Sequence, residues 1–209
     1  MPRPSNTSKR RTQIARALIQ VMAERGYDGA SIAGIARTAG LTPGLVHYHF
    51  KNKEEILLLA LGNLVEDHTA RLEAQLVEAG SDPVAEVAAF IDSHLGLGVH
   101  ADPQALACWV LLSGEALRRP DVRREYAKAV AASVERLGTA IQRGVAQGTF
   151  SCDDVPGAAS AIVATIQGYF VLAATARSVI PRGSAARSTR LMAQGLLRPA
   201  SPSALGGPI

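Results

Sequence analysis

Between residues 47 and 53 of this 209-residue chain, several side chains that bind phosphate lie close together. His47, Tyr48 and His49 are followed by Lys51 and Lys53, so imidazole, hydroxyl and ammonium groups occur within one short segment. These groups donate hydrogen bonds to phosphate oxygens, and the ammonium groups also neutralise phosphate charge. The residue types therefore indicate binding to a polyanion.

Two short helices joined by a glycine turn are expected to position this segment. A first helix is predicted from about Lys9 to Arg25, with Gly26 as its stop. Ser31 is predicted to cap the second helix, over residues 32–39, and Gly40 to supply the turn after it. Thr42 is predicted to cap a third, short helix with Pro43 at its first position, where a missing N–H costs nothing. A short helix presented by its N-terminal end suits the major groove of duplex DNA.

The expected roles differ along this third helix. Gly44 would let the backbone approach DNA closely, and Pro43 or Leu45 would touch thymine methyl groups. Asn52 is predicted to cap a fourth helix, with Glu55 completing a capping box. Lys53 would lie at the N-terminus of that helix, where free N–H groups and the helix dipole already attract phosphate. The predicted DNA-contacting residues are Ser31, Thr42, Pro43, Gly44, Leu45, His47, Tyr48, His49, Lys51 and Lys53. Phe50 and Leu41 are expected in the core instead.

Basic charge is concentrated in the first quarter of the chain. Residues 1–53 contain nine Lys and Arg and two acidic residues, a balance of +7, whereas residues 54–209 contain thirteen and sixteen, a balance of −3. The two sum to the formal net charge of +4. This asymmetry is typical of a chain that meets a polyanion through one segment only. A run of charge that merely aids solubility is the alternative.

Apolar residues recur at helical spacing along most of the chain, and no alternating pattern typical of a strand is found. We predict an all-α fold of about nine helices: three short ones, a long connector helix from Lys53 to Gly80, and five behind it. Asp-Pro pairs at 82–83 and 102–103 are strong start signals for two later helices. Residues 1–8 are expected to form a disordered arm and residues 199–209 a disordered tail.

Residues from about 10 to 61 resemble the DNA-binding domain of TetR-family transcriptional regulators. The matching pieces are Ile14-Ala-Arg-Ala-Leu18, Gly26-Tyr-Asp-Gly-Ala-Ser31, Ile35-Ala36, Ala39-Gly-Leu41, Gly44, Phe50, Lys53 and Leu57. The family's usual Leu-Tyr-x-Tyr-Phe run stands here as Val46-His-Tyr-His-Phe50, so histidine occupies two tyrosine-like positions. The segments 107–121 and 143–150 look like the ligand domain of the betaine/choline-type subgroup.

The resemblance implies a sequence-specific regulator of transcription, usually a ligand-responsive repressor that binds a palindromic operator as a homodimer. A helix-turn-helix DNA-binding domain would cover residues 9–53, and a helical ligand-binding and dimerisation domain residues 54–198. A shift in the rear domain would swing the recognition helices through the connector helix, in a change of conformational population. No cofactor is expected.

Two sets of residues are candidates for the roles of the rear domain. The resemblance places the dimer interface on the last two helices, where apolar residues form a stripe: Ala158, Ile162, Ile166, Tyr169, Leu191 and Leu196. An effector pocket would be lined by polar or aromatic groups on apolar helices: His94, Trp109, Ser113, Tyr126, Gln167 and Phe170. The effector would be apolar or cationic and amphipathic, with Trp109 a candidate for cation–π contact. An ordinary core remains the alternative for each residue.

Other function classes find little support. The two cysteines lack metal-ligand spacing, which favours a reducing cytosol. The sequence is not expected to contain an apolar run of about 18 residues that could span a membrane. Residues 1–8 have no apolar core behind a basic start, so a secretory signal is not expected and a cytoplasmic protein is. An enzyme built on Cys108, His94 and Asp92 would need a motif that is lacking. A constitutive DNA-binding or interaction protein with a filled core is the remaining alternative.

Overall fold

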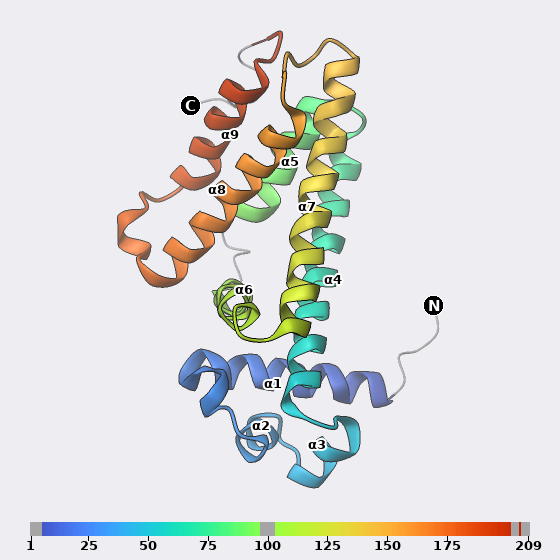
Figure 1. The fold of residues 1–209 in the computed structure, drawn as a ribbon, viewed down its shortest axis with the longest axis vertical. Coiled ribbons are helices and arrows are strands. Elements are labelled where there is room, and N and C mark those ends of the chain that lie inside the picture. Colours follow the sequence, from blue (N-terminus) through green and yellow to red (C-terminus); the bar gives the residue numbers. More distant parts are fainter. Residues whose placement is uncertain (1–5, 97–102, 202–204, 206–209) are drawn as a thin grey trace. The chain divides into compact units, whose positions relative to one another are not determined.

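The computed structural model describes the chain except for residues 1–5, 97–102, 202–204 and 206–209. The described part is helical (Figure 1), and it confirms the predicted all-α fold. A single bridge between Phe150 and Pro199 is the β-type pairing found there. The helices are α1 (Asn6–Gly29), α2 (Ile32–Thr38), α3 (Pro43–His49), α4 (Lys53–Ala79), α5 (Pro83–Leu95), α6 (Pro103–Ala116), α7 (Pro120–Ala146), α8 (Val155–Thr175), the 3-10 helix η1 (Arg177–Val179) and α9 (Ser184–Leu197).

The chain divides into two compact units. The first unit contains residues 1–67 and 102–127, and the second contains residues 68–101 and 128–209. The first half of α4 and all of α6 therefore belong with the N-terminal helices, although both fall within the rear domain expected from the sequence, residues 54–198. The physical reason is burial: Cys108 and Leu112 of α6 lie in one apolar core with the residues of α1.

Local signals in the first unit produce the helix boundaries that the sequence predicts. Gly26 interrupts α1 with φ +70° and ψ 172°, a conformation that glycine adopts without a Cβ clash. Ser31 Oγ accepts a hydrogen bond from the Gly34 N–H at 3.0 Å, so it is the N-cap of α2. Thr42 Oγ1 accepts from the Leu45 N–H at 3.3 Å and caps α3, with Pro43 at the first position. These predictions are confirmed.

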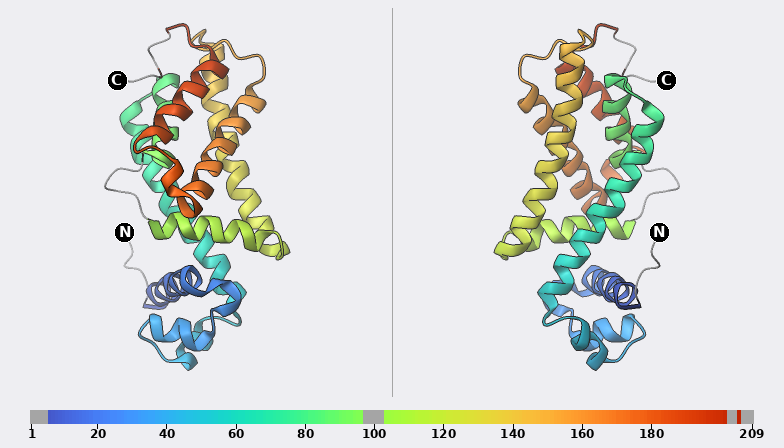
Figure 2. Two further views of the ribbon diagram at one scale, coloured as in Figure 1. Left: turned by 90° about the vertical axis from the view of Figure 1, so that its left-hand side faces the viewer. Right: turned by 90° about the vertical axis from the view of Figure 1, so that its right-hand side faces the viewer.

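The second unit is formed by α5, α8, α9 and parts of α4 and α7. In both views of Figure 2, α8 (orange) and α9 (red) run side by side, and they are in direct contact. Its core is aliphatic, with Ile91, Leu137, Ile141 and Ile162 almost fully buried. The expected Asp82-Pro83 start is observed, because Asp82 Oδ1 accepts from the Val84 N–H at 3.1 Å. Asp102 lies outside the described residues.

The ends of the chain are more ordered than the sequence suggested. Of the expected arm, Asn6–Ser8 already belong to α1, and residues 1–5 lie outside the described part. Of the expected tail, Pro199 pairs with Phe150, and Leu205 is buried in the second core. Pro199 and Leu205 of the expected tail are therefore in contact with the rest of the second unit.

α8 is apolar on more than one face. It is long and apolar enough to cross a membrane by length and composition, contrary to the expectation that no such run exists. Core helices of soluble proteins meet the same criterion. Ala158, Ile162 and Ile166 are covered by other helices of the second unit, so these three residues of the stripe expected at a dimer interface belong to the chain's own core. Tyr169 is half-buried against this core.

Candidate nucleic-acid interface

α3 has one buried face and one exposed face. Val46 is fully buried in the first core, and Phe50, directly after the helix, is 3% exposed. Pro43, His47 and Tyr48 project to the other side, where Tyr48 is 79% exposed. Val46 is held in the core, and the two residues that follow it, His47 and Tyr48, are left exposed. The helix is thus anchored by apolar contacts and presents hydrogen-bonding groups.

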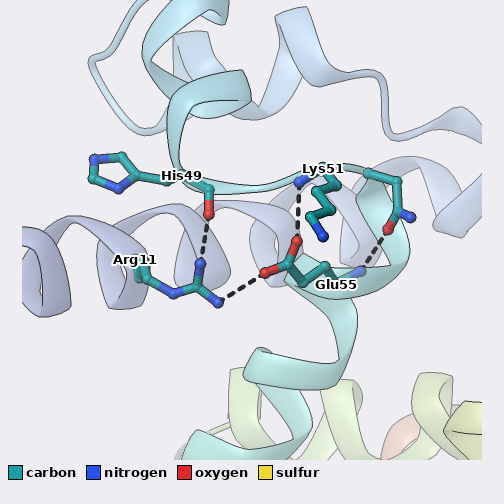
Figure 3. A network of polar contacts seen from close by, with 5 residues as sticks. Arg11, His49, Lys51 and Glu55 are labelled. Carbon is teal, nitrogen blue, oxygen red and sulfur yellow. Dashed lines mark hydrogen bonds and ion pairs between the residues drawn. The ribbon is translucent and has the colours of Figure 1, made fainter.

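A polar network holds the C-terminal end of α3 against α4 and α1 (Figure 3). The Arg11 guanidinium donates to the His49 carbonyl and, at 3.1 Å, to Glu55 Oε1, and it lies 4.1 Å from the centre of the Phe50 ring. Glu55 Oε2 accepts from the Lys51 N–H at 2.9 Å. The Lys51 hydrogen bond, followed by the Arg11 guanidinium, holds the pKa of Glu55 below its usual value. Arg11 is therefore a structural residue of this site.

The start of α4 is capped as the sequence indicated. Asn52 Oδ1 accepts a hydrogen bond from the Glu55 N–H at 2.8 Å, and the Glu55 carboxylate accepts one from the Lys51 N–H. This reciprocal pair resembles a capping box that reaches one residue further back than usual. It fixes the short connection between α3 and α4, on which Lys51 is exposed.

Lys53 is held by the end of α1. Its Nζ donates to the Tyr27 carbonyl at 2.6 Å and lies 4.1 Å from the centre of the Tyr27 ring. Burial lowers the pKa of Lys53. An ammonium group has three donors, so one bond to Tyr27 leaves others for a phosphate. Lys53 is consequently a positioned cation, whereas Lys51 is a solvent-exposed one.

The structure places the predicted DNA-contacting residues at the start of α2, along α3 and at the start of α4, all in the first unit. Ser31 and Thr42 use their hydroxyl oxygens as caps, and each O–H remains able to donate. His49 is half-buried, and its ring meets that of Tyr48 edge-on with centroids 5.1 Å apart. The sequence did not reveal the supporting role of Arg11, because its partners lie 38 and 44 residues away.

The six candidate ligand residues are divided between the units. Trp109 and Tyr126 belong to the first, with ring centroids 4.8 Å apart, as does Ser113, whose hydroxyl donates to the Val110 carbonyl. His94, Gln167 and Phe170 belong to the second unit. The first unit also contains a pocket of about 360 Å³ between α1, the end of α2, α4 and α6, and none of the six residues lines it.

A cluster of rings surrounds His94 in the second unit. The His68 ring lies 4.1 Å, the Phe90 ring 4.5 Å and the Phe170 ring 6.3 Å from the His94 ring, measured between centroids. His94 Nδ1 lies 2.7 Å from the Phe90 carbonyl, an acceptor, so this nitrogen carries the proton. Burial lowers the pKa of His94 to about 4 and that of His68 to about 3. No group of three or more metal-ligating side chains occurs among the described residues.

Large aliphatic side chains are exposed on α8 and α9. Val171 and Leu172 of α8 are 45% and 39% exposed, and Leu191 and Met192 of α9 are 55% and 52% exposed. Leu196, one turn further along α9, is also exposed. We call these five residues the α8–α9 apolar face. It includes two of the predicted interface residues, Leu191 and Leu196.

Two family models match the chain. The model described as "Bacterial regulatory proteins, tetR family" matches residues 14–60, which include α2 and α3. The model described as "BetI-type transcriptional repressor, C-terminal" matches residues 83–198, more than half of the chain. The two matches together cover both compact units in large part.

Curated relatives agree with these matches. The HTH-type transcriptional regulator BetI of Rhizobium meliloti is 31% identical over 128 residues, which cover 59% of this chain and 60% of that protein. In that match the chain spans less than two thirds of its relative's length. BetI of Brucella suis is 26% identical over 191 residues, covering 82% of this chain and 95% of the relative.

Solved structures share the fold. A TetR transcription regulator from Haloarcula marismortui superimposes with a TM-score of 0.81 at 19% identity, covering 91% of this chain and 99% of the other. A transcriptional regulator from Saccharomonospora viridis, solved in complex with choline, gives a TM-score of 0.75 at 25% identity, covering 90% and 95%. Together with the helix-turn-helix geometry of the first unit, these findings show that the chain belongs to the TetR family of DNA-binding transcriptional regulators and has a BetI-type C-terminal region.

Proposed function

We propose that the chain is a repressor that binds a palindromic operator as a homodimer and releases it when a small-molecule effector binds. The exposed face of α3 carries this proposal. Pro43, His47 and Tyr48 project from a helix that Val46 anchors in the core. In helix-turn-helix proteins such a helix enters the major groove, where an imidazole and a phenol reach base edges or phosphates.

The α8–α9 apolar face supports the proposed homodimer. Five large aliphatic side chains exposed on two neighbouring helices form a surface that a second copy would cover. One short recognition helix reads few base pairs, so a dimer that reaches two half-sites is needed for specificity. The same pairing would explain why α8 is apolar both toward its own core and away from it.

Two clusters suggest two chemical classes of effector. Trp109 and Tyr126 form a tilted pair of rings whose faces can attract a cation, and a structural neighbour was solved with choline. The rings around His94 favour an uncharged molecule, because burial keeps both imidazoles neutral. Choline is therefore the first probe to use, and uncharged aromatic compounds are the second.

The mechanism we propose is a shift between conformations that bind operator well and badly. Helix α4 is continuous through the two units, so it can transmit a change in the second unit to the first. The effector must then lower the affinity for the operator by the same factor by which the operator lowers the affinity for the effector.

The test is a titration of a labelled DNA fragment from upstream of the chain's own gene, with and without saturating choline. We expect choline to weaken DNA binding, and DNA to weaken choline binding equally. If the two affinities prove independent, choline is not the effector. If no compound of either class changes DNA affinity, the effector-responsive mechanism fails.

A constitutive DNA-binding protein is the second candidate. The division of the predicted ligand residues between the two units favours it, as does their absence from the lining of the first-unit pocket. A thermal-shift screen separates the candidates, since a ligand that binds only the folded state raises its stability. No stabilisation by cationic or uncharged compounds, combined with tight operator binding, would support the constitutive protein.

A further inference from the structure

We propose that Arg119 is a positioning residue for operator binding, which acts through Tyr27 on Lys53. This inference rests on the proposed contact between Lys53 and an operator phosphate. Arg119 lies in the turn between α6 and α7, 66 residues beyond Lys53 and outside the helix-turn-helix. Nothing in its local sequence indicates a role in DNA binding.

Two cations share the ring of Tyr27. The Lys53 ammonium and the Arg119 guanidinium carbon each lie 4.1 Å from the ring centre. Both cations therefore lie within cation–π distance of the same ring. Tyr27 is buried, and both faces of an aromatic ring carry negative potential that attracts cations. We call these three residues the Tyr27 bracket.

Acidic residues balance the two positive charges of the bracket. Arg119 Nε donates to Glu115 Oε2 at 3.0 Å, and its Nη2 lies 3.9 Å from Asp28 Oδ1. Asp28 and Glu115 also raise the pKa of Lys53, which burial lowers. The charges of Lys53 and Arg119 repel each other, and the ring and these carboxylates offset that repulsion.

The bracket joins three segments that are distant in sequence. Tyr27 is at the end of α1, Lys53 is the first residue of α4, and Arg119 follows α6. The aliphatic face of α6 packs on α1 through Leu112 and Ala116, which keeps the turn after α6 close to Tyr27. Residues 102–127 precede the part of α7 that belongs to the second unit. A rearrangement of the α6–α7 turn would therefore move Arg119 away from the ring that orients Lys53.

The experiment is a double-mutant cycle on the full chain, with operator affinity measured at several salt concentrations. Lys53→Gln should weaken binding about tenfold and reduce the salt dependence by roughly one counterion, since a phosphate contact is lost. Arg119→Gln should weaken binding about fivefold. In the Lys53→Gln background, Arg119→Gln should have almost no further effect, because the residue through which it acts is gone.

Two variants control for charge and for folding. Arg118→Gln makes the same charge change one residue away on an exposed side chain, and it should alter affinity less than about twofold. Arg119→Lys retains a cation over the ring and should restore most of the affinity. If Arg119→Gln does not fold, Glu115→Gln replaces it in the cycle, because it removes the nearest carboxylate of Arg119 and leaves the ring untouched.

The outcomes separate this inference from the proposed function. If Lys53→Gln leaves operator affinity unchanged, the assignment of Lys53 to the operator contact is wrong. If Lys53→Gln weakens binding but the effects of Lys53→Gln and Arg119→Gln simply add, Arg119 does not act through Lys53. If Arg118→Gln and Arg119→Gln lower operator affinity equally, the effect of Arg119 is general electrostatic attraction, and the inference is also overturned.

Discussion

Helix α3 in the first unit and helices α8 and α9 in the second all expose large side chains, but of opposite kinds. α3 exposes Tyr48 beside His47, side chains that can donate hydrogen bonds. α8 and α9 expose aliphatic groups such as Leu191 and Met192, which have nothing to donate. Exposed hydrogen-bonding aromatics suit a hydrated polyanion, whereas exposed aliphatics suit another protein surface. The type of exposed group is therefore the basis on which we propose α3 as the DNA-binding face and α8–α9 as the self-association face.

The largest expected effect concerns the α8–α9 apolar face. Leu191→Glu would place a charge in the proposed interface twice per dimer, and we expect it to weaken self-association by about a thousandfold, since a buried unpaired charge is costly. Sedimentation velocity measures the change from dimer to monomer. Val77→Glu, at an 82% exposed position of α4, is the matched control and should leave association unchanged. A dimer that survives Leu191→Glu would show that the aliphatic groups serve another purpose.

Acid should destabilise the second unit through its histidines. Burial lowers the pKa of His94 to about 4, whereas an unfolded histidine titrates near 6.5, so the unfolded chain binds a proton that the folded chain excludes. The stability due to this group is complete above about pH 6.5 and falls as the pH decreases toward 4, by roughly 3 kcal/mol in all. His68, with a pKa of about 3, adds to the loss.

Urea unfolding of the wild type and of His94→Phe at pH 7.0, 5.5 and 4.5 tests this prediction. The variant should lose less stability between pH 7.0 and 4.5. Phe170→Leu is the control, because it disturbs the same cluster without removing a titrating group, so its stability should fall in parallel with that of the wild type. Identical pH profiles for His94→Phe and the wild type would contradict the assignment.

On the α3 side of the comparison, the double change His47→Ala and Tyr48→Ala should weaken operator binding by about a hundredfold, since two contacts to DNA are lost. Thermal unfolding should be unaffected, because both side chains are exposed and the anchor Val46 is retained. Fluorescence anisotropy with labelled operator measures the affinity. Arg182→Ala, a charge change in the second unit, should leave it nearly unchanged. Full affinity in the double variant would mean that α3 does not face the DNA.

The smallest expected effect concerns the caps that orient the two short helices. Ser31→Ala and Thr42→Ala each remove a hydrogen bond to a helix N–H, so we expect each to cost about 1 kcal/mol in the free energy of unfolding. Chemical denaturation provides the measurement. Thr38→Ala, an exposed position at the end of α2, is the control. A Ser31 variant as stable as its control would exclude a capping contribution.

The sequence determined the helix boundaries of the first unit, because their signals are local. Ser31, Thr42 and Asn52 each bond to an N–H three residues later, and Gly26 and Gly40 adopt the positive φ that glycine tolerates. Such contacts depend only on neighbours along the chain, so composition and spacing were enough to predict them. The same local pattern carries the resemblance to the DNA-binding domain.

Only the tertiary structure decided which residues support the site and which face of α8 is free. Arg11 meets Glu55 across 44 residues, and Arg119 meets Tyr27 across an even longer separation. On α8, an apolar stripe is compatible with a core or with an interface, and the packing of α5 and α9 assigned Ile162 and Ile166 to the core. Helical periodicity predicts that one face of a helix is buried. Which other part of the protein covers that face depends on how segments distant in the sequence pack.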